Sequence, residues 1–143
     1  MKSWFPIFAL AVVAASPAAA QEDYEARRRA LTGISEIFGE LHHIRRSCAP
    51  ERESDAWRDR MKRLIDLEQP AFDLREEMVD RFNDGYASAS ARFPYCDRDA
   101  EDYAAARAAA GEALVAGLAA PLFAAARGGD DDSVNVYRGD PFP

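Results

Sequence analysis

The residue types that most often carry out chemistry in proteins are gathered in one short stretch, ELHHIRRSC, from Glu40 to Cys48. Glu40 and His43 have the Glu-x-x-His spacing that supplies metal ligands inside some helical bundles. His42 and Cys48 are the residue types of a general base and a cysteine nucleophile. The stretch could therefore form a metal centre, a site with a thiol nucleophile, or only part of a structural helix.

The spacing within this stretch argues against both sites. Successive residues of an α-helix point about 100° apart, so His42 and His43 do not face one ion. The chain holds no other histidine, so no second Glu-x-x-His motif completes a metal site. His42 and Cys48 are separated by about 9 Å of helical rise. We predict no metal-binding or catalytic residue here, with His42 at the edge of the core. The solvated face is expected to hold Glu36, Glu40 and His43.

Four segments of the chain have the three- and four-residue apolar spacing of amphipathic helices. Pro50 and Pro70 follow the first two, and a residue that precedes proline disfavours the helical conformation. Pro121 is expected to kink or end the fourth, alanine-rich helix. Short connections favour antiparallel neighbours. We predict an all-α fold, a small antiparallel bundle of three long helices and a more weakly packed fourth, at residues 22–48, 54–69, 73–92 and 99–126.

Gly85 lies on the apolar face of the third predicted helix, within FNDGY. Glycine inside a helix costs about 1 kcal/mol relative to alanine. Close approach of another helix at Gly85 is the explanation we favour, and a local turn at residues 83–85 is the alternative.

The N-terminal residues have the three parts of a secretory signal peptide. Lys2 is the positive end, an apolar run follows, and small residues lead to a cleavage position after Ala20. The apolar run is shorter than the about 20 residues of a spanning helix. The C-terminal residues are rich in glycine, aspartate and proline, a composition typical of flexible segments. We predict an exported protein without a transmembrane segment in its mature chain, divided into a signal peptide at 1–20, a helical domain at 21–127 and a flexible acidic tail at 128–143.

The negative net charge of the chain argues against nucleic acids and anionic lipids as partners. The chain has 18 basic and 25 acidic residues, a net charge of −7, and the removal of Lys2 with the signal peptide makes the mature chain more acidic. Nucleic-acid binding depends on neutralising phosphates with a basic patch, and acidic residues flank each group of arginines. We therefore expect no nucleic-acid partner and no adhesion to anionic lipid.

The two cysteines, Cys48 and Cys96, are expected to form a disulfide, because an exported chain with a single pair of cysteines is normally oxidised. The bond would join the end of the first helix to the end of the third, which an up-down-up order brings to the same end of the bundle. The chain has neither a C-x-x-C redox motif nor a C-x-x-C-H haem motif, so no cofactor is expected.

Three charged residues fall on the apolar faces of the predicted helices. Arg45 lies within the stripe of the first helix, Glu68 continues that of the second, and Arg107 lies in line with Tyr103 on the fourth. A single buried charge is costly, whereas opposite charges satisfy one another. We predict that Glu68 pairs with Arg45, and with Arg107, in a buried polar cluster. The alternative is that the arginines reach water along their aliphatic stems.

Such a cluster either fixes the register of the helices, the interpretation we favour, or forms the floor of a ligand pocket, since pockets combine apolar walls with a few polar groups. The walls of that pocket would be Phe38, His42, Trp57 and Phe82.

The fourth predicted helix has an uncharged run at residues 113–126, bounded by Glu112 and Arg127. It is too short to span a bilayer, so part of its apolar surface is available to a partner. Ordinary burial of an alanine-rich helix is the alternative. The predicted partner surface consists of Leu114, Leu118, Leu122 and Phe123.

Five motifs taken together resemble an uncharacterised family of short exported proteins from alphaproteobacteria. The resemblance covers about residues 30–97 and implies a Gram-negative periplasm, with no established activity or catalytic residue. The motifs are GELHHIRRSC (39–48), WRDRM (57–61), LEQP (67–70), FNDGY (82–86) and FPYC (93–96).

We expect a non-enzymatic interaction or accessory protein of the cell envelope, because the apolar run offers a surface for a protein and the acid–base candidates are few. The partner would be another envelope protein. The alternative is a small-ligand-binding protein with a pocket between helices near Arg45 and Glu68.

Overall fold

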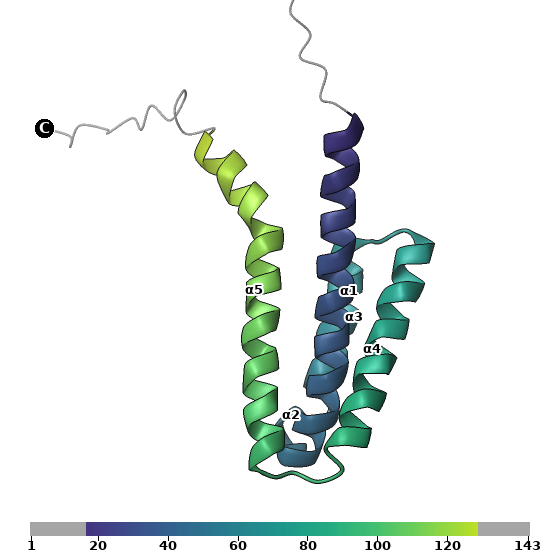
Figure 1. Cartoon of the computed structure of the whole chain (residues 1–143), viewed down its shortest axis with the longest axis vertical. Helices are drawn as coiled ribbons and strands as arrows, with labels where there is room; N and C mark the ends of the chain where they lie inside the picture. The colour runs from purple at the N-terminus through teal and green to yellow at the C-terminus, as the bar shows by residue number, and fades with distance from the viewer. Residues whose placement is uncertain (1–16, 129–143) are drawn as a thin grey trace, which may run out of the picture.

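The computed structural model describes residues 17–128, and within them the chain is helical and has no strand (Figure 1). The long helices alternate in direction, so the predicted all-α antiparallel bundle is confirmed. Most of the predicted signal peptide and tail, residues 1–16 and 129–143, lies outside the described residues. The helices are α1 (Pro17–Cys48), α2 (Pro50–Glu53), α3 (Ala56–Glu68), α4 (Phe72–Arg92) and α5 (Arg98–Gly128).

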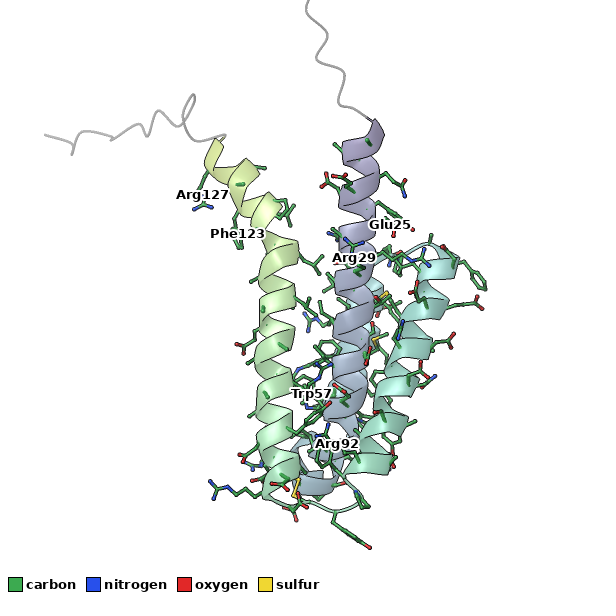
Figure 2. All side chains as sticks on the ribbon, in the orientation of Figure 1. Glu25, Arg29, Trp57, Arg92, Phe123 and Arg127 are labelled. Carbon is green, nitrogen blue, oxygen red and sulfur yellow. A yellow bond between two sulfur atoms is a disulfide. The ribbon has the colours of Figure 1, made fainter. Side chains whose placement is uncertain are left out.

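The helix boundaries differ from the predicted ones mainly at prolines. Within the described residues α1 runs from Pro17. The short helix α2 begins at Pro50, because the first turn of a helix accepts a residue without an N–H group. α5 continues through Pro121. Its last turns, which carry Phe123 and Arg127, tilt away from the rest of the helix (Figure 2). Pro121 therefore bends α5 and does not end it.

α1 is the central helix, and α3, α4 and α5 each pack against it (Figure 1). Its buried side chains consequently cover more than one face, and they contribute to two apolar clusters along its length. Because neighbours surround it, the side of α1 opposite its main apolar stripe is covered as well. The cluster nearer the C-terminal end of α1 contains Ile37, Leu41, Ile44, Ala89, Phe93, Ala100 and Ala104, and the other contains Leu31, Met61, Leu74 and Met78.

α1 and α4 cross at two glycines. A Cβ atom added to Gly85 would lie 2.2 Å from the carbonyl oxygen of Glu36, and one added to Gly39 would lie 1.9 Å from that of Phe82. Side chains at either position would overlap backbone atoms of the facing helix. The close approach predicted for Gly85 is confirmed, and Gly39 is its counterpart on α1.

The substitution Gly39→Ala is expected to lower the free energy of unfolding by about 3 kcal/mol, the upper end of the usual cost of overpacking, because α4 has to move away from α1. Gly117→Ala on α5 is the matched control, since its added Cβ has no neighbour within 4 Å. This control should raise the stability by about 0.5–1 kcal/mol through helix propensity. Urea unfolding of both variants measures the difference, and equal stabilities would contradict the crossing.

The predicted disulfide between Cys48 and Cys96 is confirmed, with the two Cα atoms 5.1 Å apart. It joins the last residue of α1 to the connection between α4 and α5. Figure 2 shows the bond between the two sulfur atoms at the closed end of the bundle. The bond therefore ties together the three longest helices where they meet.

Candidate functional site

The two histidines of ELHHIRRSC point to different surroundings. His42 is 4% exposed and lies near the rings of Phe82 and Tyr86, with both pairs of ring centroids 5.7 Å apart. His43 has its Nε2 atom 2.8 Å from the carbonyl oxygen of Phe93. His43 also lies edge-on to the Tyr86 ring, with centroids 5.4 Å apart. The two histidines therefore share Tyr86 of α4 as a neighbour and differ in their other contacts.

His42 carries a buried nitrogen atom, Nδ1, that has no hydrogen-bond partner among the described residues. Burial lowers the pKa of His42 below its ordinary value, and the charges of Arg46 and Arg58 lower it further. Asp55 and Asp59 act in the opposite direction. Folding therefore favours the neutral imidazole over the charged one.

The stability of the protein is expected to fall as the pH drops below about 6.5, the ordinary pKa of histidine. In that range the unfolded chain binds a proton that folded His42 does not, and the loss levels off below the lowered pKa of the folded state. Urea unfolding between pH 7.5 and 5 measures the effect, with His42→Leu as the comparison. If the variant loses stability over this range as steeply as the natural chain, His42 is not the cause.

One group of possible metal ligands lies at the disulfide. Among residues 17–128, one such group of at least three side chains comes together, formed by Cys48, Cys96 and Glu101. Both sulfur atoms are joined in the disulfide, so neither is a thiolate ligand in this oxidised state.

The predicted pairing of Arg45 with Glu68 is wrong. Glu68 pairs with Arg27, and the Nε atom of Arg45 lies 3.9 Å from a carboxylate oxygen of Glu53. The reason is the antiparallel order of the helices: the end of α3 returns to the first half of α1, whereas Arg45 lies near the other end. A floor made of Arg45 and Glu68 therefore does not exist.

Arg107 does take part in a buried polar cluster, but its partner is Glu40. Glu40 is 4% exposed and accepts hydrogen bonds from the Arg107 guanidinium and from the Tyr103 hydroxyl, the latter at 2.7 Å. Burial, and then the hydrogen bond to Glu40, raise the pKa of Tyr103. The guanidinium of Arg92 lies 4.8 Å from the Tyr103 ring centroid. This cluster fastens α5 to α1.

The predicted position of Glu40 on a solvated face is wrong, because Glu40 is buried. One signal pointed to the buried cluster: Tyr103 and Arg107 are spaced four residues apart on a helix face that is otherwise apolar. Two donors on such a face require an acceptor from another helix.

The walls predicted for a ligand pocket separate into two pairs. His42 lies against Phe82, as described above, and neither of them is among the residues that line the groove of the other pair. Phe38 and Trp57 have ring centroids 5.7 Å apart and line an open groove of about 650 Å³ between α1, α3 and α5. We call it the Trp57 groove. Figure 2 shows Trp57 between α5 and α1.

The Trp57 groove is mainly apolar. Arg60 and Glu112 are the charged side chains that line it, and the Arg60 guanidinium stacks 4.1 Å from the Trp57 ring centroid. The α5 wall includes Val115 and Phe123, which are 51% and 64% exposed. Large apolar side chains of α5 therefore stand uncovered beside an apolar hollow.

The residues of the predicted partner surface fall into a packed pair and an exposed pair. Leu114 and Leu118 are half-buried and pack against the two core clusters, so they belong to the bundle. Leu122 and Phe123 lie beyond the bend at Pro121 and are 70% and 64% exposed. A second hollow, of about 520 Å³, lies on the other side of α5 against the N-terminal half of α1. α5 therefore has an open hollow on each flank: the Trp57 groove lies against residues 37–41 of α1, and the second hollow lies against residues 23–30.

The apolar character of α5 extends over most of its length. By length and composition, residues Arg98–Arg127 are apolar enough to cross a membrane, and very little of this segment is buried inside the protein. Core helices of soluble proteins meet the same criterion but are mostly buried. α5 therefore has an uncovered apolar surface.

One protein-family model matches residues 24–121, and that family is described as a protein of unknown function (DUF2385). The matched span includes both cysteines, the glycine crossing and most of the Trp57 groove. Neither the curated proteins nor the solved structures gave a match to the chain.

Proposed function

The chain belongs to the DUF2385 family of unknown function, and we propose that it is a non-enzymatic protein of the periplasm that binds a helix of a protein partner in the Trp57 groove. The observation that carries the proposal is the uncovered apolar wall of α5 beside this groove, with Val115 and Phe123 exposed. Contiguous exposed apolar surface of this kind is typical of protein-binding sites. A groove lined on one side by a helix suits an amphipathic helix.

Three features support export to the periplasm. The disulfide between Cys48 and Cys96 suits an oxidising compartment. Ala18–Ala20, at the predicted cleavage position, are exposed in the first turn of α1. Cleavage after Ala20 would shorten α1 by about one turn without removing a core residue. The likeness of the five motifs to exported alphaproteobacterial proteins points the same way.

The charges of α5 favour a protein partner over a membrane. A span of about 20 residues that ended at residue 126 would begin at Arg107, which is paired with buried Glu40, so insertion of α5 across a bilayer would break this pair. The uncharged run at 113–126 is shorter than the about 20 residues that a spanning helix needs. A small ligand would find few polar groups to orient it, since Arg60 is already stacked on Trp57.

The first test is a pull-down of the tagged, exported protein after crosslinking in cells. Phe123→Asp puts a charge in the Trp57 groove, and Val79→Asp on α4 is the matched control, because Val79 is an exposed apolar residue outside the groove. We expect a crosslinked protein that is lost with Phe123→Asp and kept with Val79→Asp. Equal loss or equal retention in both variants would overturn the proposal. The proposal would also be overturned if no protein were captured and a small molecule that binds at Trp57 stabilised the purified protein.

A further inference from the structure

One face of α5 has a regular arrangement of side chains along the Trp57 groove. Glu112, Ala116, Ala119, Phe123 and Arg127 follow one another at intervals of three or four residues, which places them on one side of a helix. The first four line the Trp57 groove. The face is therefore acidic at one end, basic at the other and uncharged between them.

This charge order is complementary to itself when the helix is reversed. In an antiparallel pair of α5 helices, Glu112 of each copy meets Arg127 of the other, whereas a parallel pair would place like charges together. Neither Glu112 nor Arg127 forms a salt bridge with any residue in 17–128, and the Nε atom of Arg127 donates a hydrogen bond of 3.3 Å to the carbonyl oxygen of Phe123 in the same helix. Both charges are thus available for such a contact.

The sizes of the side chains are complementary in the same register. Phe123 lies four residues before Arg127, and Ala116 lies four residues after Glu112, so the exposed ring of one copy faces the methyl group of the other. Ala119 then lies next to its equivalent in the second copy, at the centre of the contact. A small residue at that point allows two helices to approach closely, and the bend at Pro121 turns Phe123 away from its own bundle.

We infer that the occupant of the Trp57 groove is α5 of a second copy of this chain, packed antiparallel about a twofold axis; this inference rests on the proposed function. Isologous twofold dimers are the commonest homo-oligomers. A stable dimer buries about 800 Å² on each partner. Trp57 and Arg60 of α3, which line the same groove, extend the contact beyond α5.

The test is the molar mass of the purified mature chain by light scattering, together with charge reversals. The natural chain should be a dimer. Glu112→Arg alone and Arg127→Glu alone should each raise the dimer dissociation constant by about tenfold or more, because each places like charges together twice per dimer. The double variant should restore it. Glu101→Arg, an exposed reversal in the first turn of α5, is the control and should change nothing.

A cysteine placed at the twofold axis gives an independent readout. Ala119→Cys should form a covalent dimer on oxidation, whereas Ala110→Cys, which is exposed on the opposite side of α5, should not. A monomeric natural chain would overturn the inference, and so would a dimer whose charge reversals are not rescued by the double variant. If the chain is monomeric but Phe123→Asp still abolishes crosslinking to a different protein in cells, the proposed function stands and the second copy is excluded as its partner.

Discussion

Replacing Glu40 with alanine is expected to lower the free energy of unfolding by about 3 kcal/mol or more, because the loss of one member of a buried ion pair leaves the other uncompensated. Glu40 is almost fully buried and accepts from both Arg107 and Tyr103. Arg107 is partly exposed, so water recovers some of the loss, and this places the effect at the lower end of the usual range of about 3–5 kcal/mol. Urea unfolding monitored by circular dichroism measures it.

Glu36→Ala is the matched control for Glu40→Ala. Glu36 lies one turn earlier on the same side of α1, with a side chain that is 40% exposed and a carboxylate oxygen 3.9 Å from Arg81. An exposed pair of this kind contributes about 1 kcal/mol or less. If the two variants are equally stable, Glu40 does not anchor α5.

Removing the disulfide is expected to cost about 4 kcal/mol, the chain-entropy value for a closed loop of this length, since Cys48 and Cys96 are 48 positions apart in the sequence. Small domains have a total stability of about 5–15 kcal/mol, so the double variant Cys48→Ser, Cys96→Ser should be marginally folded. Unfolding curves of this variant and of the natural chain measure the loss.

The natural chain under strong reductant should match the double serine variant, because both lack only the bond. A double variant as stable as the oxidised natural chain would contradict a stabilising role of the disulfide. If only the reduced natural chain kept its stability, incomplete reduction would be the first matter to check, by counting free thiols.

The helices and the disulfide could be predicted because their causes are local in the sequence. Apolar residues at helical spacing, with prolines beyond them, fix where helices form. The single pair of cysteines leaves one pairing to consider. The close approach at Gly85 could also be predicted, because glycine destabilises a helix and its presence on the apolar face is explained by close packing of another helix.

The polar cluster could not be predicted fully because it depends on the register between helices. The apolar stripes locate Arg45 and Glu68 on the inner faces of their own helices but do not say which levels of two helices meet. Glu40 was missed for a related reason. The side of α1 opposite its main stripe is covered only because α4 approaches at Gly39 and α5 packs beside it, and these are tertiary events.

The apolar run of α5 could also be predicted only in part from the sequence. Its composition predicted an apolar surface, and part of that surface is exposed. Which leucines face the bundle depends on where α1 lies, so Leu114 and Leu118 are packed while Leu122 and Phe123 are not. The Trp57 groove itself is formed by three helices, and no single segment encodes it.

The most direct test of the central claim, that the Trp57 groove binds a protein helix, is site-specific photocrosslinking in the living cell. A photoreactive amino acid replaces Val115 in the groove or Val79 on α4, and mass spectrometry identifies the captured peptides. We predict a crosslink from position 115 to one helical segment, which the further inference identifies as α5 of a second copy, and none from position 79. Capture from neither position, or the same products from both, would contradict the claim.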